Sequence, residues 1–340
     1  MKRVKYFFLT VFSWGLLTAG YAEETFPKIT IRDGKFYAGG EELLLVSVGY
    51  IHVRPGQDYN DAVPYKDYGY DLIDLDMKRI KEAGFNAIRT WHLPDPKYVE
   101  LARKHGLWVV GGIWTQTQIN LDDELAAEQA VGTVAVLSRT YAKYPNVAML
   151  LLLNEPDMNL LMKQDAAKLK AYFDRLVETA HENCPGVPVA FSNWSNAGFI
   201  DSASWDVVGY NIYPWGSQVF QKVIGYQGFI KGMMKCKARN KPFYLTEFGY
   251  WTPVPKLNPK DHWGMTYVPN EEEQARRLVR DSDTIYQMGL AGGALLSWAD
   301  NWVASAESFS PEIPKPPGYA NKDVHDMETI EWAGINSYDH

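Results

Sequence analysis

The sequence has 340 residues, 22% charged residues and a net charge of −7. This acidic balance argues against nucleic acid or an anionic membrane surface as a partner, because both attract basic proteins. The length exceeds that of a small domain and suits one α/β barrel, which needs about 250 residues plus insertions.

The first 22 residues have the order of a secretory signal peptide. Lys2, Arg3 and Lys5 precede the apolar run Tyr6–Leu17, and small residues lead to a cleavage point after Ala22. The alternative is an uncleaved membrane anchor, but the run is shorter than the roughly 20 residues that span a bilayer. We predict export to the periplasm or the extracellular space, without stable membrane insertion of the mature chain. Cleavage would make the net charge −10.

The mature chain, residues 23–340, is predicted to be a single catalytic domain that begins with a short β-hairpin. Its arms are Ile29–Tyr37 and Glu42–Leu45 around Gly39-Gly40, and it would close the bottom of a barrel. Eight apolar runs follow and predict parallel strands covered on both faces. These strands are Leu44–Ile51, Phe85–Trp91, Leu107–Trp114, Val147–Asn154, Val187–Trp194, Asp206–Tyr213, Phe243–Glu247 and Ala294–Trp298.

Amphipathic segments between these runs predict helices that connect one strand to the next. They are Leu72–Ala83, Pro96–His105, Asp122–Tyr144, Ala166–Asn183, Phe220–Arg239 and Glu271–Met288. Gly84 and Gly106 are placed to end two of them. The link after Trp194 is less clearly helical. The alternation predicts a (β/α)8 TIM barrel, an α/β fold, over an open doubly wound sheet, which would carry a glycine-rich loop after the first strand.

Two long connections, Tyr250–Asn270 and Asp300–Met327, are rich in proline and aromatic residues. Both follow the carboxyl end of a strand, the face on which barrels carry their active sites. The two cysteines, Cys184 and Cys236, each follow or end a helix that precedes a strand. A disulfide between them and two separate thiols both remain open at this point, because spacing does not give the Cα distance.

Two glutamates stand where an apolar strand stops. Glu155 follows Leu150–Asn154, and Glu247 ends the seventh strand. A carboxyl group at the end of such a run is partly desolvated, which raises its pKa unless a partner compensates. Strands four and seven lie nearly opposite each other across a barrel mouth, so the two side chains can converge. Glycoside hydrolysis needs such a pair, one protonated and one ionised. A lone strand-end glutamate would more simply form a salt bridge.

The chain resembles the retaining barrels of clan A of the glycoside hydrolases. The segment Phe85–Pro94, continued by Tyr98–Val110, is similar to the second and third strands of family 2 catalytic barrels. Asn154-Glu155 resembles the acid/base signature of the clan, and Thr246–Gly249 resembles its nucleophile strand. The resemblance covers residues 27–300.

This resemblance implies Glu155 as acid/base and Glu247 as nucleophile, with the carboxyl groups about 5–5.5 Å apart. It also implies that Asn154 bonds the sugar 2-hydroxyl and that Arg89 keeps Glu247 ionised. Adjacent strand residues face opposite ways, so Asn154 and Glu155 can share the pocket only if the strand end kinks or bulges. For Arg89 the alternative is a salt bridge within the barrel.

The sixth strand adds two side chains to the predicted site. Tyr213 is the better candidate to bond Glu247, and Asn211 shares its strand face, whereas Tyr210 points the other way. His92 could bond a substrate hydroxyl, or it could be a satisfied structural group. Trp298 matches the sugar platform of the clan. Seven tryptophans fall at or just after predicted strand ends, namely Trp91, Trp114, Trp194, Trp215, Trp251, Trp298 and Trp302.

This tryptophan distribution indicates several sugar subsites and therefore an oligo- or polysaccharide substrate, with Trp114 and Trp215 among the binding residues. The segment Tyr210–Trp215 also resembles barrels that cut or rearrange β-1,3-glucans. This resemblance implies an endo-acting β-glucanase or glucanosyltransferase, and we predict no cofactor. Family 2 barrels usually follow β-sandwich domains, for which this chain has no room, and this argues against their typical action on terminal sugars. An exo-acting β-galactosidase or β-mannosidase is nevertheless the rival hypothesis. A metal-dependent hydrolase would need clustered ligands, for which His52 and His92 are the obvious strand-end histidines. An inactive sugar-binding barrel is the remaining hypothesis. No metal site is predicted.

Overall fold

The computed structural model describes residues 25–51, 70–93, 95–115, 120–213, 218–250, 270–300 and 334–336. The predicted signal peptide lies outside these ranges, as do Trp215, Trp251, Trp302 and most of the two long connections. Signal cleavage and the contributions of these tryptophans therefore stay predictions.

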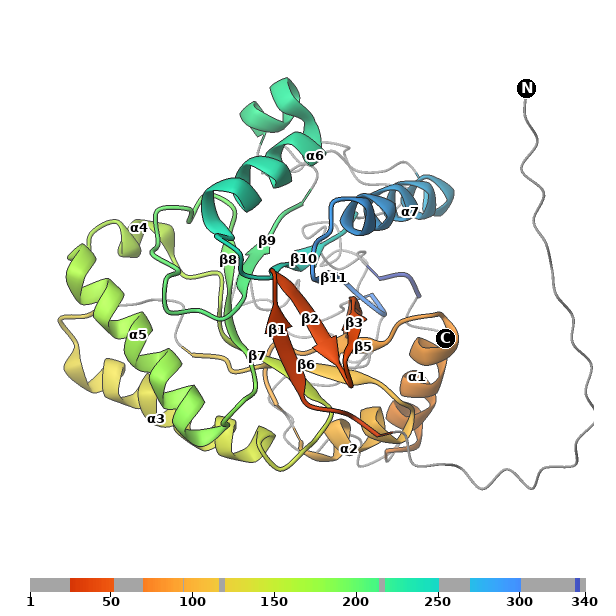
Figure 1. The fold of residues 1–340 in the computed structure, drawn as a ribbon, viewed down its shortest axis with the longest axis horizontal. Helices are drawn as coiled ribbons and strands as arrows, with labels where there is room; N and C mark the ends of the chain where they lie inside the picture. Colours follow the sequence, from red (N-terminus) through yellow and green to blue (C-terminus); the bar gives the residue numbers. More distant parts are fainter. Residues whose placement is uncertain are drawn as a thin grey trace, which may run out of the picture.

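Eight parallel strands form a closed barrel in the order β10-β11-β4-β5-β6-β7-β8-β9 (Figure 1). Closure excludes the open doubly wound sheet and confirms the predicted (β/α)8 fold. The barrel strands are β4 (Leu45–Gly49), β5 (Ala87–Arg89), β6 (Trp108–Gly112), β7 (Val147–Asn154), β8 (Val189–Trp194), β9 (Val208–Asn211), β10 (Phe243–Phe248) and β11 (Gly292–Leu295).

The predicted helices surround the barrel (Figure 1). They are α1 (Asp71–Glu82), α2 (Lys97–Lys104), α3 (Glu124–Tyr141), α5 (Ala166–Asn183), α6 (Gln218–Lys237) and α7 (Glu271–Gln287), with a short α4 (Met158–Leu161) that was not predicted. Side chains of Asp123, Asp165 and Asn270 accept hydrogen bonds from backbone N–H groups at the start of α3, α5 and α7. Gly84 and Gly106 have positive φ, as expected of residues that end helices.

Strand β7 illustrates why these segments form a barrel. All of its residues from Val147 to Leu153 are buried, because one face packs inside the barrel and the other packs under helices. Helix α5 buries one side, with Leu169, Phe173, Leu176 and Ala180 at helical spacing. The link between β8 and β9 contains no helix, in agreement with its weak helical pattern.

The N-terminal segment forms a three-stranded antiparallel sheet, not a single hairpin. Its strands are β1 (Ile29–Arg32), β2 (Lys35–Ala38) and β3 (Glu41–Leu43). The predicted arm Ile29–Tyr37 is broken at Asp33-Gly34, where both residues have positive φ. An Asp-Gly pair favours a tight hairpin turn, and this signal outweighs the continuous β pattern.

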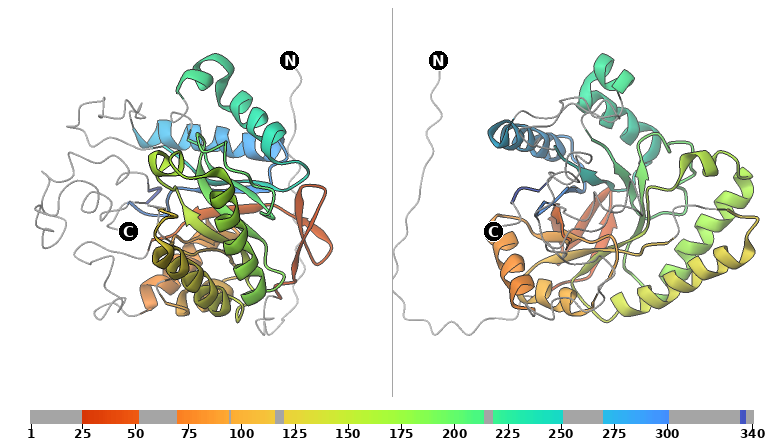
Figure 2. Two further views of the ribbon diagram at one scale, coloured as in Figure 1. Left: turned by 90° about the vertical axis from the view of Figure 1, so that its left-hand side faces the viewer. Right: turned by 180° about the vertical axis from the view of Figure 1, so that it is seen from behind.

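The sheet covers one end of the barrel (Figure 2). Phe36 is fully buried and belongs to the same apolar cluster as Leu45 and Trp108 of the barrel interior. Phe26 packs edge-on against Trp108, with ring centroids 4.8 Å apart. Because these contacts involve the amino-terminal ends of the strands, the opposite end remains for the site. The predicted closure of the barrel bottom is therefore present.

Some boundaries differ from the prediction. The last strand is Gly292–Leu295, not Ala294–Trp298, because its ladder to β4 runs from Gly292 to Leu295. Beyond it, Leu296 and Trp298 each still donate one backbone hydrogen bond, to Phe248 and Gly49. Helix α6 is kinked at Gly225, whose φ of 73° and ψ of 168° are not helical.

The two cysteines do not form a disulfide. Cys184 is buried and Cys236 is exposed, and both are free thiols.

Candidate active site

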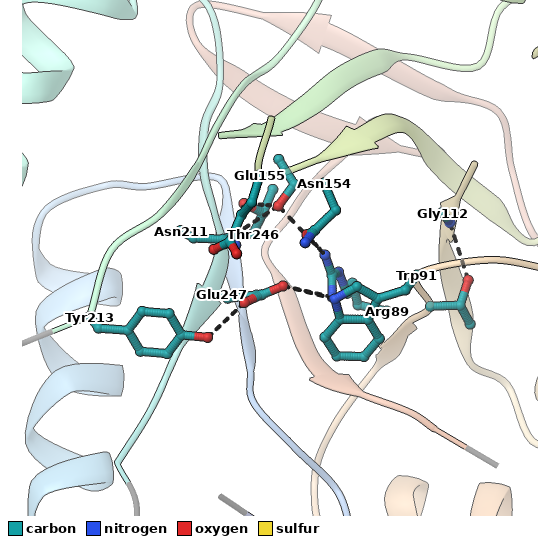
Figure 3. Close-up of polar contacts among 11 residues, drawn as sticks. Arg89, Trp91, Gly112, Asn154, Glu155, Asn211, Tyr213, Thr246 and Glu247 are labelled. Carbon is teal, nitrogen blue, oxygen red and sulfur yellow. Dashed lines mark hydrogen bonds and ion pairs between the residues drawn. The ribbon is translucent and has the colours of Figure 1, made fainter. Parts of the chain in front are cut away.

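Strand β7 ends in an irregularity that brings two successive side chains to the barrel mouth. The pairing of β7 with β8 shifts register between Leu151 and Asn154. Glu155 then has a φ of 47°, in the left-handed region. In a regular strand these neighbours would face opposite ways, but here both contact residues of the same cluster (Figure 3). The predicted kink is therefore present.

Strand β10 contains a second irregularity opposite the first. Its pairing with β9 shifts register between Leu245 and Glu247. As a result, Thr246 donates a hydrogen bond to Oδ1 of Asn211 at 2.6 Å, while Glu247 also points into the mouth (Figure 3). Both glutamates thus follow distorted strand ends, where side chains can be redirected.

Glu247 is contacted by three donors. Arg89 Nη1 lies 2.8 Å from Oε1 in an ion pair, and both side chains are buried, at 1% and 6% exposure. Trp91 donates from its indole N–H to the same oxygen at 3.0 Å, and Tyr213 donates to Oε2 at 2.6 Å. A guanidinium and two hydrogen-bond donors thus surround this buried carboxyl group, and all three are complementary to negative charge. The contacts predicted for Arg89 and Tyr213 are both present.

Glu155 has a different environment. Its Oε1 accepts a hydrogen bond from the Asn211 side-chain amide, and it has no cation of its own among the described residues. Burial raises the pKa of Glu155 well above its usual range, and the charge of nearby Glu247 raises it further. Asn211 and Arg89 oppose this shift without cancelling it. Glu155 is therefore suited to hold a proton at a pH at which an ordinary carboxyl group is ionised.

A polar network on the inner barrel wall fixes the orientation of these groups. Oδ1 of Asn211 accepts hydrogen bonds from Ser192 at 2.8 Å and from Thr246 at 2.6 Å, so its amide group points to Glu155. Arg89 also donates from Nη2 to Oδ1 of Asn154 at 2.7 Å. The guanidinium thereby connects the end of β7 to Glu247 on β10.

The structure brings six of the predicted site residues into one cluster: Arg89, Asn154, Glu155, Asn211, Tyr213 and Glu247. Tyr210 faces the other way, as predicted, and stacks on Phe243.

Trp298, His92 and Trp114 lie at strand ends around the mouth. Trp298 follows β11, is 6% exposed, and donates its backbone N–H to the carbonyl of Gly49 at 2.8 Å. His92 follows β5, and burial lowers its pKa. Trp114 follows β6 and is 47% exposed, which leaves part of its ring surface available to a ligand.

Two side chains of the site, Ser192 and Thr246, were not predicted, and Trp91 was expected only as one of the strand-end tryptophans that indicate sugar subsites, not as a contact of Glu247. Trp91 stands two residues after Arg89, so the alternation of a strand places both on one face, and this signal was present in the sequence. Thr246 precedes Glu247 and faces the site only because of the distortion in β10. Ser192 is a small polar residue within an apolar run, with no sequence signal that distinguishes it from a core serine.

Within the described ranges, no group of three or more His, Cys, Asp or Glu residues is close enough together to hold a metal ion. His52, invoked for the metal-dependent hypothesis, lies outside them. None of the helices in the described part of the chain combines the length and the apolar character that a membrane crossing requires.

Comparison with known proteins supports the fold assignment. No family model matches the sequence. A β-galactosidase of Psychromonas ingrahamii is 33% identical over 86 residues, which are 25% of this chain and 8% of that protein. Solved structures with a similar fold include β-glucuronidases of Ruminococcus gnavus, in complex with D-glucuronic acid, and of Faecalibacterium prausnitzii. They have TM-scores of 0.68 and identities of 17% and 18%, over 92% of this chain.

The chain spans about half the length of these solved structures, 49% in both cases. The β-glucuronidase of Bifidobacterium dentium, complexed with coumarin-3-O-glucuronide, gives a TM-score of 0.66 at 19% identity. The resemblance to barrels of glycoside hydrolases, predicted from short motifs, is confirmed at the level of the fold.

Proposed function

We propose that this chain is a retaining β-glycosidase that acts by double displacement. The observation that carries the proposal is the pair of glutamates at the barrel mouth in unlike environments. Glu247 lies beside a guanidinium and two further donors, whereas burial and the charge of Glu247 raise the pKa of Glu155. One ionised and one protonated carboxyl group are what this chemistry requires.

In the first step, the Glu247 carboxylate attacks the anomeric carbon while Glu155 gives its proton to the glycosidic oxygen, and the leaving sugar departs as an alcohol. In the second step, ionised Glu155 removes a proton from water or from an acceptor hydroxyl, which attacks the anomeric carbon and releases Glu247. Asn154, held by Arg89, bonds the sugar 2-hydroxyl. Both steps invert the anomeric centre, so the product retains its configuration. A carboxyl separation of about 5–5.5 Å belongs to this mechanism.

For the substrate we infer an oligo- or polysaccharide cleaved or transferred by endo action, with a β-glucan as the preferred class. The exposed ring of Trp114 beside the site supports binding of sugars beyond the cleaved bond. The names of the similar proteins, β-galactosidase and β-glucuronidase, favour the rival hypothesis, exo action on a terminal sugar. We retain export and a single catalytic domain from residue 23 as parts of the proposal. N-terminal sequencing of secreted protein tests export and the cleavage point, and a single cooperative melting transition of the mature protein tests the single domain.

Product analysis separates the substrate hypotheses. The purified chain is incubated with laminarin, mannan, galactan and aryl β-glucosides, β-galactosides, β-mannosides and β-glucuronides. Short oligosaccharides indicate endo hydrolysis, elongated ones indicate transfer, and a released monosaccharide indicates exo action. Proton NMR of the first product distinguishes retention from inversion.

Variants test the two glutamates. Glu247→Ala should abolish turnover. Glu155→Ala should still cleave an aryl glycoside with a good leaving group, because that group needs little protonation, but its second step should be slow. Azide should then restore the rate and give a β-glycosyl azide. Glu182→Ala, an exposed glutamate on α5, is the control and should behave as wild type. Wild-type rates in both site variants would contradict the proposal.

A further inference from the structure

Trp91 contacts both members of the buried ion pair in the site. Its indole N–H donates to Oε1 of Glu247 at 3.0 Å, and the guanidinium of Arg89 lies over its ring, with Cζ 3.6 Å from the ring centroid. Figure 3 shows the ring beneath Arg89 and beside Glu247. A guanidinium stacked on an indole is held by the ring quadrupole, so one side chain restrains the cation and the anion together.

The neighbouring strands leave space for this ring. A Cβ atom added at Gly49, at the end of β4, would lie 2.7 Å from Cη2 of Trp91. One added at Gly112, at the end of β6, would lie 2.4 Å from the Trp91 backbone carbonyl carbon. Both distances are too short for a side chain, so glycine on either side of β5 is a condition for this position of Trp91. Gly49 of β4 therefore makes room for the ring, and Gly112 of β6 makes room for the backbone that carries it.

The two carboxylate oxygens of Glu247 are unequally engaged. Oε1 accepts a hydrogen bond from the Trp91 indole N–H and lies 2.8 Å from Arg89 Nη1 in an ion pair, whereas Oε2 accepts only the Tyr213 hydroxyl among the described residues. A carboxylate oxygen has about two lone-pair sites. Each oxygen accepts one hydrogen bond, but Oε1 also faces the guanidinium charge, whereas the second lone-pair site of Oε2 is available to form a new bond.

We propose that Trp91 is a positioning residue that, with Arg89, reserves Oε1 of Glu247 for charge stabilisation and leaves Oε2 to attack the anomeric carbon. This inference rests on the proposed function. In the covalent intermediate, Oε2 is esterified and Oε1 is the carbonyl oxygen. When the ester breaks, negative charge returns to the carboxylate, and the N–H of Trp91 stabilises the leaving group. Trp91 therefore acts chiefly in the second step.

The kinetics of Trp91→Phe test this assignment, because phenylalanine keeps a ring under Arg89 and removes only the N–H donor. With an activated aryl glycoside, for which the second step limits turnover, we expect kcat to fall about tenfold, the effect of losing about 1.4 kcal/mol of hydrogen bonding to a charged group. KM should fall in parallel because the intermediate accumulates, so kcat/KM should change much less.

A structural role alone would give a different result, namely a lower melting temperature with a loss of kcat/KM. Trp205→Phe is the matched control, because Trp205 is 1% exposed and packs against Phe191 outside the site. Trp205→Phe should lower the melting temperature, but it should not lower kcat and KM in parallel on an activated aryl glycoside.

A crystal structure of the enzyme trapped with a 2-deoxy-2-fluoro glycoside tests the oxygen assignment directly. The ester should join the sugar to the oxygen next to Tyr213, with Trp91 still donating to the other. An ester through the oxygen next to Trp91, or an unchanged kcat in Trp91→Phe, would overturn the inference while leaving the proposed function intact. No wild-type turnover on any glycoside would overturn both.

Discussion

Replacing Tyr213 with phenylalanine removes one hydroxyl from the wall of the site and keeps the ring. That hydroxyl donates to Oε2 of Glu247 at 2.6 Å, and the side chain is buried. A hydrogen bond to a charged group contributes about 1.5–3 kcal/mol. This bond regains its full strength when the glycosyl-enzyme ester breaks and charge returns to the carboxylate. Since about 1.4 kcal/mol corresponds to a factor of ten, we predict that kcat on an activated aryl glycoside falls roughly 10- to 150-fold.

The assay compares kcat of Tyr213→Phe with that of Tyr210→Phe on one activated aryl glycoside. Tyr210 lies on the same segment but on the other face, where it stacks on Phe243, and its hydroxyl has no hydrogen-bond partner among the described residues. The two variants delete the same atom from neighbouring buried tyrosines. Tyr210→Phe should therefore leave kcat unchanged.

Thermal melting of both variants separates loss of folding from loss of chemistry. The reasoning holds if both proteins melt cooperatively and Tyr213→Phe alone is impaired. Equal activity of Tyr213→Phe and wild type, or equal impairment of the two variants, would refute the assignment of Tyr213 to Glu247.

The electrostatics and packing of the site give three more expectations. Burial and the neighbouring carboxylate raise the pKa of Glu155. The activity of the wild type on unactivated glycosides should therefore persist at pH values above the usual carboxyl pKa and fall as pH rises through the raised pKa. A profile of kcat/KM against pH measures this. Burial raises the pKa of Asp300 to about 7, so the folded state favours its protonated form. The free energy of unfolding should therefore decline as pH rises from about 4 to above 7. Melting temperatures measured across this pH range should decline less in Asp300→Asn than in the wild type. Gly49→Ala would place a methyl group 2.7 Å from the Trp91 ring and should lower both kcat and melting temperature. Gly132 is its control: it is exposed on α3 and an added Cβ would have nothing within 4 Å, so Gly132→Ala should raise the melting temperature, because alanine is favoured in a helix by about 0.5–1 kcal/mol.

The barrel could be predicted because its strands carry a strong sequence signal. The run Val147–Asn154 is apolar on both faces, and β7 has the same bounds. Arg89 and Tyr213 could be placed on the inner wall by strand alternation, and both contact Glu247. The same alternation places Trp91 beside Arg89, so this contact was also within reach of the sequence pattern.

Features that depend on local distortion were less accessible. Thr246 and Glu247 both reach the site only because β10 shifts register at that point, and no residue there signals the shift. The kink of α6 depends on Gly225, a residue that a helix can also tolerate in regular geometry. The Asp33-Gly34 turn did carry a signal, which the longer β pattern obscured.

The identity of the covalently modified residue tests the two-glutamate mechanism most directly. The enzyme is incubated with a panel of 2-deoxy-2-fluoro-β-glycosyl fluorides, and peptides of any inactivated sample are mapped by mass spectrometry. We predict one fluoroglycosyl group on Glu247, on the strand that ends Thr246-Glu247-Phe248, and no label in Glu247→Gln. A label on Glu155 or on any other residue, or turnover with inversion at the anomeric carbon, would contradict the mechanism.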